Sequence, residues 1–209
     1  MKKESLIQYW KNNTIITNQK VISAFKKVKR EDFILKNQRQ FAYEDVPLSI
    51  GFNATISQPT TVMIMTQALE PEEGNKILEI GTGSGYQAAL LSVLVGKTGK
   101  IITTEMISEL ADFSRKNLEN FQNVTVILTD GSKGYEEEAP FDRILVTAAS
   151  PKIPNHLYDQ LKDPGILLVP AGDEYSQELI KVTKKDFQIK KESLGYFQFV
   201  PLKGKFGFK

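Results

Sequence analysis

Hydrophobic and polar positions repeat along the chain with two different periods, and these periods predict its strands and helices. From residue 76 onward, short apolar runs of strand length alternate with longer segments of helical spacing. Strands that alternate with helices in this way are typical of βαβ units, which build a mostly parallel, doubly wound sheet. The predicted strands are 76–81, 100–105, 123–130, 141–150 and 165–172, the predicted helices are 85–95, 107–121 and 153–161, and the β-rich segments 178–185 and 193–202 are expected to add antiparallel strands at one edge.

The N-terminal part of the chain departs from this alternation. Val21, Ile22 and Phe25 follow helical spacing with lysines on the other side, which predicts an amphipathic helix over 18–29. Residues 29–52 are punctuated by proline and glycine and predict irregular chain. We therefore expect a helical and loop extension ahead of the alternating part.

A small, polar segment, NATISQPTT at 53–61, precedes an apolar run that predicts a helix over about 59–70. Pro59 suits the first turn of that helix, and we expect Ser57 or Thr60 to cap it. A loop this rich in hydroxyl groups also raises the question of whether Ser57 acts in chemistry.

Length and composition indicate a globular protein. At 209 residues, with 41% apolar and 25% charged residues, the chain is long enough to bury a core. We expect one domain over 1–209, in which 1–70 form the extension and 76–209 form an α/β core. The absence of cysteine excludes a disulfide framework and a thiolate nucleophile, and the single histidine, His156, argues against a metal site or a Ser-His-Asp triad.

The sequence suggests a cytoplasmic protein without membrane contact. The N-terminal stretch MKKESLIQYWKNN lacks the uninterrupted apolar run of a signal peptide, and no run of 18 apolar residues occurs in the chain. We therefore interpret the three N-x-T patterns, at Asn12, Asn53 and Asn123, as unmodified.

Charge is unevenly distributed, although the net charge is only +2. Residues 1–40 carry ten Lys and Arg against three Asp and Glu (net +7), residues 41–140 carry six against fourteen (net −8), and the remainder is net +3. One interpretation is a solvated basic face at each end. The other is a basic flank that attracts an anionic substrate to an acidic core with a cationic cofactor.

A glycine-rich loop, Gly81-Thr82-Gly83-Ser84-Gly85, follows a predicted strand and opens a predicted helix. Glycines let the backbone turn sharply and approach a ligand, and the helix N-terminus offers free N–H groups. Glu105 ends the next predicted strand, about 20 residues on, where a carboxylate can accept both hydroxyls of a ribose. The pattern favours a nucleoside cofactor over a turn that only closes a βα unit.

Glu79 discriminates between two classes of cofactor. Dinucleotide-binding loops run G-x-G-x-x-G/A, whereas Tyr86 stands here where the third glycine would be, which disfavours an NAD-dependent oxidoreductase. A carboxylate at Glu79 is unfavourable for a pyrophosphate and favourable for a sulfonium and an ammonium group. The E-x-G-x-G-x-G arrangement therefore predicts S-adenosylmethionine and the Rossmann-like fold of class I methyltransferases.

The pair Asp130-Gly131 closes the third predicted strand. An acidic residue there can accept a hydrogen bond from the amino group of adenine, and the glycine leaves room for the ring. Such a pair is also a common strand-to-turn ending. Together with the glycine loop and Glu105, it would complete a nucleoside cradle at the carboxyl ends of consecutive strands.

The end of the fourth predicted strand restricts the methyl acceptor. Methylases of exocyclic amines in nucleobases usually carry Asn/Asp-Pro-Pro-aromatic at this point, whereas this chain has Thr147-Ala148-Ala149-Ser150. The chain also offers no obvious general base. An acceptor carboxylate, with a pKa of about 3–4, is ionised at neutral pH and needs only positioning and desolvation. The hydroxyls of NATISQPTT can position it.

Five segments resemble protein-L-isoaspartate O-methyltransferase: AYEDVPLSIGFNATISQP, ILEIGTGSGYQAALLS, DGSKGYEEEAPFDRILVTAAS, IPNHLYDQL and FVPLKG. The resemblance runs from about residue 5 to the C-terminus, and ISQP followed by GTGSGYQAA, DGS and VTAA is far more specific than a generic methyltransferase loop. It implies an enzyme that methylates the α-carboxylate of L-isoaspartyl residues in damaged proteins and peptides. The ester then collapses to a succinimide, which hydrolyses partly to normal aspartate.

The resemblance also implies roles for individual residues. The family's active-site serine falls on Ser57. Some relatives have SAPHMHA where this chain has SQPTTVM, so their histidine contacts are not carried over, and the tail KGKFGFK resembles the family only up to its first glycine. The implied cofactor contacts are Thr55, Ile56, Ser57, Glu79, Gly81, Thr82, Gly83, Gly85, Glu105, Asp130 and Gly131.

Two alternatives remain open at this point. The first is a methyltransferase of the same fold that acts on a small molecule or on RNA, and RNA would require a concentrated basic face with interleaved aromatic residues. The second is a noncatalytic protein that binds the cofactor, against which the intact acidic residues and serine loop argue. We expect a monomer that acts on isoaspartyl-containing proteins and peptides, with no nucleic acid partner.

Overall fold

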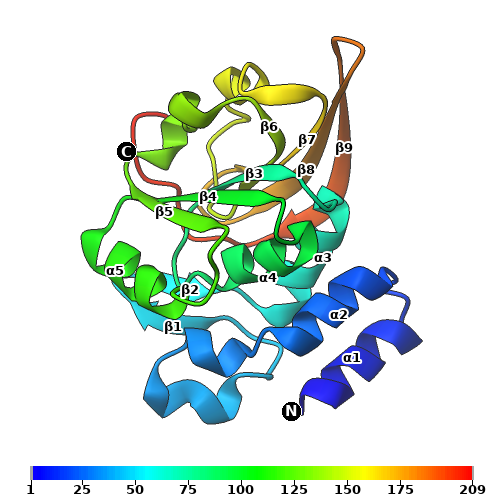
Figure 1. Cartoon of the computed structure of the whole chain (residues 1–209), viewed down its shortest axis with the longest axis vertical. Coiled ribbons are helices and arrows are strands. Elements are labelled where there is room, and N and C mark those ends of the chain that lie inside the picture. Colours follow the sequence, from blue (N-terminus) through cyan, green and yellow to red (C-terminus); the bar gives the residue numbers. More distant parts are fainter. Residues whose placement is uncertain (1, 209) are drawn as a thin grey trace.

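A computed structural model describes residues 2–208 of the chain, and its central feature is a seven-stranded sheet (Figure 1). The strand order is β5-β4-β3-β6-β7-β8-β9. Neighbouring strands from β5 to β7 run parallel, whereas β8 and β9 pair antiparallel to their neighbours at one edge. The predicted sheet, mostly parallel with antiparallel C-terminal strands, is confirmed.

Strands and helices follow one another along the chain largely in the predicted order. The strands are β1 Leu48–Gly51, β2 Ala54–Ile56, β3 Lys76–Ile80, β4 Lys100–Glu105, β5 Val124–Leu128, β6 Phe141–Val146, β7 Leu161–Gly172, β8 Gln177–Lys185 and β9 Gln188–Phe197. The α-helices are α1 Lys3–Asn12, α2 Gln19–Lys27, α3 Pro59–Leu69, α4 Tyr86–Val95 and α5 Ser108–Asn117, and the 3-10 helices are η1 Arg30–Phe33, η2 Lys36–Phe41, η3 Gly131–Lys133, η4 Glu136–Glu138 and η5 Asn155–Tyr158.

The direction of the chain across the sheet reverses at β3. From β3 the chain moves outward through β4 to β5, then returns to place β6 on the other side of β3. Because parallel crossovers are right-handed, the two directions of travel place their connections on opposite faces of the sheet. Figure 1 accordingly shows α3, α4 and α5 on one side of the sheet, with α1 and α2 farther out on that side.

The two faces of the sheet bury separate hydrophobic clusters. Successive residues of a strand point to opposite faces. In β3, Ile77 joins the cluster formed with the α-helices, whereas Leu78 and Ile80 join the cluster on the other face. That second face is covered by η5, through Leu157, and by the C-terminal segment, through Leu202. The inner strands β3 and β4 are therefore buried on both sides, as their apolar residues predict, whereas the edge strand β9 is largely exposed.

Some predictions about local structure were wrong, and one helix was missed. Residues 29–52 contain two 3-10 helices and β1, which pairs with β2 as a separate hairpin. The helix expected over 153–161 is only the single turn η5, because the carbonyl of Gln160 already accepts the Phe141 N–H (2.8 Å) and β7 begins beside β6 at the next residue. The helix α1 was not predicted at all.

The N-terminus of α3 is capped from a distance. Pro59 occupies the first helical turn as predicted, but neither Ser57 nor Thr60 acts as the cap. Instead, the carboxylate of Asp45 accepts both the main-chain N–H of Thr60 (2.9 Å) and its hydroxyl (2.6 Å). Trp10 in α1 donates its indole N–H to the same hydroxyl (2.7 Å), so the N-terminal extension is tied to the start of α3.

We predict that Asp45→Ala lowers the free energy of unfolding by about 1–2 kcal/mol, because it removes the only carboxylate at this helix start among the described residues. Denaturant titration measures the loss. Asp112→Ala, which removes an exposed carboxylate paired with Arg115, is the control and should cost less than about 0.5 kcal/mol. Equal effects of the two substitutions would contradict the cap.

Candidate active site

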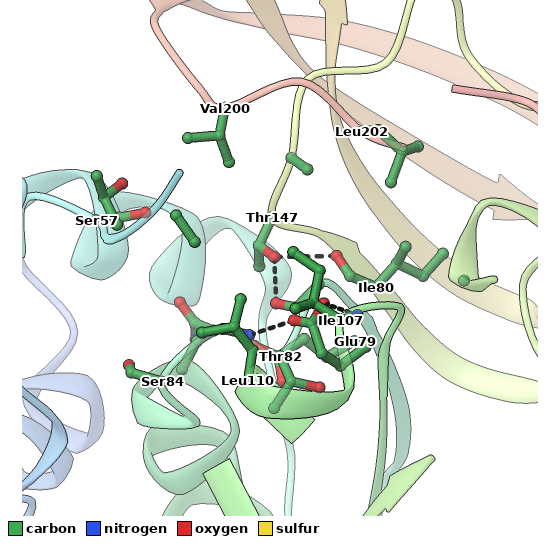
Figure 2. Close-up of a pocket in the computed structure, with 18 of the residues that line it drawn as sticks. Ser57, Glu79, Ile80, Thr82, Ser84, Ile107, Leu110, Thr147, Val200 and Leu202 are labelled. Carbon is green, nitrogen blue, oxygen red and sulfur yellow. Dashed lines mark hydrogen bonds between the residues drawn. The ribbon is translucent and has the colours of Figure 1, made fainter. Parts of the chain in front are cut away.

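A cavity of about 740 Å³ lies at the carboxyl ends of β3, β4 and β6, where the strand order reverses. Its size falls within the range of small-molecule and cofactor sites, and its position is the one at which open α/β sheets bind ligands. Figure 2 shows Ser57 on one side of it, Val200 and Leu202 on another, and Thr147 between them.

The glycine loop after β3 forms the floor of the cavity. Gly81 has φ +100°, and a Cβ there would approach the Thr147 hydroxyl oxygen to 2.5 Å. That hydroxyl lies 2.9 Å from the carbonyl of Ile80 and 2.6 Å from that of Gly81, which ties the end of β6 to the loop (Figure 2). Glycine is therefore required by both the backbone angle and the close packing.

The Glu105 carboxylate is held at the end of β4 by main-chain donors. One oxygen accepts the N–H of Gly83 (2.9 Å), and the other accepts the N–H groups of Met106 (2.8 Å) and Ile107 (3.0 Å). These bonds fix the side chain at the cavity wall, and the oxygen that accepts only the Gly83 N–H retains acceptor capacity. Glu105 thus lines the cavity, and its role toward the hydroxyls of a ribose stays a prediction.

The Glu79 carboxylate is fully buried in the cavity wall (0% exposed). One oxygen accepts the hydroxyl of Thr103 (2.5 Å), and the other has no hydrogen-bond partner within residues 2–208. Burial raises the pKa of Glu79 to about 8, the Thr103 hydrogen bond opposes the rise, and the charge of Glu105 adds to it. An unpaired, buried carboxylate suits a cationic ligand, so the chemistry of this wall fits S-adenosylmethionine.

Ser57 lies at the opposite wall, in the loop between β2 and α3. The β1–β2 hairpin brings the loop there and turns through Phe52 and Asn53, both of which have positive φ and line the cavity. The carbonyl of Ser57 accepts a hydrogen bond from Arg30 (2.7 Å). The hydroxyl-rich segment thus faces the glycine loop across a single cavity.

The cavity does not include every residue predicted for the site. Gly85 begins α4 at φ +86°, where a Cβ would meet the Leu118 side chain at 2.8 Å, so it serves the packing of the helix. Asp130 lies outside the lining, and its carboxylate accepts the N–H of Ser132 (3.0 Å) and of Lys205 (2.9 Å). The predicted residues that do line the cavity are Thr55, Ile56, Ser57, Glu79, Gly81, Thr82, Gly83, Glu105 and Gly131.

Other lining residues escaped the sequence-based prediction. Thr147 entered the sequence analysis only because the Asn/Asp-Pro-Pro-aromatic motif is absent there. Its place at the end of a predicted strand could have indicated that it lies at the site. Met106 and Ile107 gave no signal, because they are ordinary apolar positions until the fold brings them to the cavity. The segment 200–203 belongs to the family-like stretch FVPLKG, but no role at the site was predicted for it. Within residues 2–208, no group of three His, Asp or Glu side chains is arranged to hold a metal ion, and no helix is long and apolar enough to cross a membrane.

We predict that Glu79 makes the stability of the protein depend on pH. Because its pKa is raised from 4.5 to about 8, the folded protein binds a proton that the unfolded chain has released. The contribution of Glu79 is therefore fully present below pH 4.5 and is lost as the pH rises through 8, with a slope of up to about 1.4 kcal/mol per pH unit.

Denaturant titrations at pH 5, 7 and 9 check this prediction with Glu79→Gln, which stays neutral. The unfolding free energy of the wild type relative to that of Glu79→Gln should fall steadily over this range. Glu119→Gln, at an exposed position, is the control and should parallel the wild type. A constant difference between the wild type and Glu79→Gln would contradict the raised pKa.

Comparison with known proteins identifies the family of this chain. The family model for protein-L-isoaspartate(D-aspartate) O-methyltransferase matches residues 1–207. A protein-L-isoaspartate O-methyltransferase of Methanocella arvoryzae is 52% identical over 185 residues, which cover 88% of this chain and 98% of that protein. One of Thermosipho melanesiensis is 49% identical over 187 residues, covering 88% and 94%.

A solved structure shares the complete fold. A Plasmodium falciparum protein, described as a protein-L-isoaspartate O-methyltransferase and crystallised in complex with S-adenosyl-L-homocysteine, superposes with a TM-score of 0.84 at 28% identity, over 97% of this chain and 99% of that one. With a family model that spans nearly the whole chain and relatives identical at about half of their positions, this protein belongs to the protein-L-isoaspartate(D-aspartate) O-methyltransferase family.

Proposed function

We propose that this protein methylates the α-carboxylate of L-isoaspartyl residues with Ser57 as the residue that orients the acceptor. The family identifies the enzyme as an S-adenosylmethionine-dependent protein-L-isoaspartate O-methyltransferase, which initiates protein repair through a succinimide. One observation carries the assignment of roles: a single cavity has the hydroxyl-rich Ser57 loop on one wall and the glycine loop with Glu79 on another.

The acceptor needs no general base. When bound, S-adenosylmethionine supplies an electrophilic methyl group on a sulfonium and leaves as S-adenosylhomocysteine. The isoaspartyl carboxylate is already ionised at neutral pH, so its oxygen forms the new C–O bond without losing a proton. In agreement, the only histidine, His156, lies outside the cavity, where its Nε2 is 2.9 Å from the carbonyl of Ser132 and its ring packs on Phe206.

The cofactor-side roles follow from the carboxylates. Glu79, which is buried and has an unpaired oxygen, would offset the positive charge of the methyl donor, and a cation beside it favours its ionised form. Glu105, held by three main-chain N–H groups, would accept the ribose hydroxyls. Gly131 lines the cavity, where a Cβ would collide with the Thr104 side chain, and the adenine ring would lie beside this wall.

The acceptor-side role follows from the surroundings of Ser57. Apolar side chains of Ile56, Val62 and Met65 line the same side of the cavity. Water excluded by these side chains cannot solvate the incoming carboxylate, and a less solvated carboxylate is a better nucleophile. A single hydroxyl donor at Ser57 would then hold one carboxylate oxygen and leave the other directed at the methyl group.

The monomeric state is a prediction of the sequence. The cytoplasmic location and the absence of a nucleic acid substrate stay predictions of the sequence.

We predict that the purified protein transfers methyl from labelled S-adenosylmethionine to a peptide with one L-isoaspartyl residue. The matched L-aspartyl peptide, which differs only in the carboxylate it presents, should stay unlabelled. The product should be a base-labile methyl ester. Equal labelling of the two peptides, or none, would refute the proposed substrate.

We predict that Ser57→Ala lowers kcat for the isoaspartyl peptide roughly ten- to hundredfold, because it removes a hydrogen-bond donor to a charged group. The Kd for S-adenosylhomocysteine, measured by calorimetry, should change less than about threefold. Ser193→Ala, on the exposed strand β9, is the control and should leave both unchanged. A loss of cofactor affinity as large as the loss of kcat would reassign Ser57 to the cofactor.

A further inference from the structure

Arg30, in the 3-10 helix η1, is a buried cation that the proposed chemistry does not use. Its side chain is 0% exposed, and it forms no salt bridge with any carboxylate of residues 2–208. Burial lowers its pKa to about 10, against the opposing effects of Tyr86, Asp45 and Tyr43, so the guanidinium is still charged at neutral pH. A buried charge without a paired counter-charge is costly, so the other contacts of the guanidinium must stabilise it.

The contacts of the guanidinium are main-chain carbonyls and one aromatic ring. Nη1 donates to the carbonyl of Ser57 (2.7 Å), and Nη2 donates to the carbonyl of Val46 (3.4 Å), just before β1. The Cζ atom lies 5.6 Å from the ring centroid of Tyr86. Nε is buried and has no partner among the described residues.

These contacts join the two walls of the cavity. Ser57 belongs to the loop on the acceptor side, whereas Tyr86 is the first residue of α4, directly after the glycine loop on the cofactor side. The ring of Tyr86 also packs on Phe33 of η1 (5.5 Å between centroids), so η1 itself is anchored to the start of α4. Arg30 reaches from that anchor to the main chain of Ser57.

We propose that Arg30 is a positioning residue that fixes the Ser57 loop against the start of α4 and thereby sets the separation of acceptor and methyl donor. The inference rests on the proposed role of Ser57. In-line transfer is sensitive to this separation, because a displacement of about 1 Å can cost on the order of a hundredfold in rate. The N-terminal extension thus contributes to the geometry of the reaction although Arg30 does not line the cavity.

Arginine suits this task better than lysine. Its planar group can donate in two directions at once while its face lies over an aromatic ring. A lysine at the same position would keep the positive charge but not the two diverging N–H donors of the guanidinium. It therefore could not hold the carbonyls of Ser57 and Val46 in the same arrangement.

A purely electrostatic role of Arg30 would give a different kinetic result. In the reaction, a carboxylate and a sulfonium cancel each other's charge, so a nearby cation stabilises the acceptor more before the transfer than in the transition state. Loss of such an effect raises KM without lowering kcat, whereas loss of positioning lowers kcat. The ratio of the two effects therefore separates charge from geometry.

The test compares Arg30→Met, Arg30→Lys and the control Arg143→Met. Arg143 also donates to main-chain carbonyls, those of Leu69 (2.9 Å) and Glu70 (3.1 Å), but at the far end of α3 from the cavity. For each variant, one measures kcat and KM with the isoaspartyl peptide, the Kd for S-adenosylhomocysteine, the Tm, and hydrogen exchange of the main chain over residues 53–58.

Arg30→Met should lower kcat roughly ten- to hundredfold, with KM and the cofactor Kd changed less than about threefold. Hydrogen exchange over 53–58 should become faster. Arg30→Lys should lower kcat by at least about fivefold, but by less than Arg30→Met does. Arg143→Met should lower the Tm but leave kcat within about twofold.

Three results would overturn the inference: an unchanged kcat in Arg30→Met, a rise in KM alone, or a loss of activity that Arg143→Met reproduces at a similar Tm. If Arg30→Met does not fold, Arg30→Lys decides, and an unchanged kcat there overturns it. Failure of the wild type to methylate the isoaspartyl peptide refutes the proposed function instead. In that case exchange over 53–58 still decides whether Arg30 holds the loop.

Discussion

Right-handed crossovers in a parallel sheet leave a crevice wherever the chain reverses its direction across the sheet, and here that point is β3. The strands β4 and β6 flank β3, but the connections that follow β3 and β6 leave toward opposite faces. Neither of these connections therefore covers the carboxyl ends of the strands, and their end residues, Glu79, Glu105 and Thr147, meet in one cavity. The α-helical extension adds the remaining wall by carrying the Ser57 loop to this crevice.

Two buried ionisable side chains, Glu79 in the cavity wall and Arg30 outside the lining, form no ion pair among residues 2–208, and they respond to burial differently. Glu79 can become neutral, since its pKa is raised to about 8, and it can ionise when a cation arrives. Arg30 keeps its charge at neutral pH despite a pKa lowered to about 10, and it is stabilised by main-chain carbonyls and by the face of Tyr86. The arrangement of Glu79 suits a cationic ligand that binds and dissociates, whereas that of Arg30 suits a permanent structural contact.

Local patterns predicted most of the strands and helices, because each strand of the core is long enough and apolar enough to show its own period. They failed where a long-range contact decides the local structure. The cap of α3 comes from Asp45, 15 residues upstream, so no rule about neighbouring residues could find it. The turn η5 could not extend into the helix expected over 153–161, because pairing with β6 takes the chain into β7.

The amino-acid sequence by itself determined the fold class, the family resemblance and the glycine loop with its acidic partners, because these depend on residues close together in the chain or at strand ends in a regular alternation. Only the tertiary structure decided which candidates share the cavity. It excluded Gly85 and Asp130 from the lining, and it added Thr147 and the segment 200–203. It also brought Arg30 to the carbonyl of Ser57, 27 positions away. Contacts of this kind arise from packing between distant segments, which no local period in the sequence records.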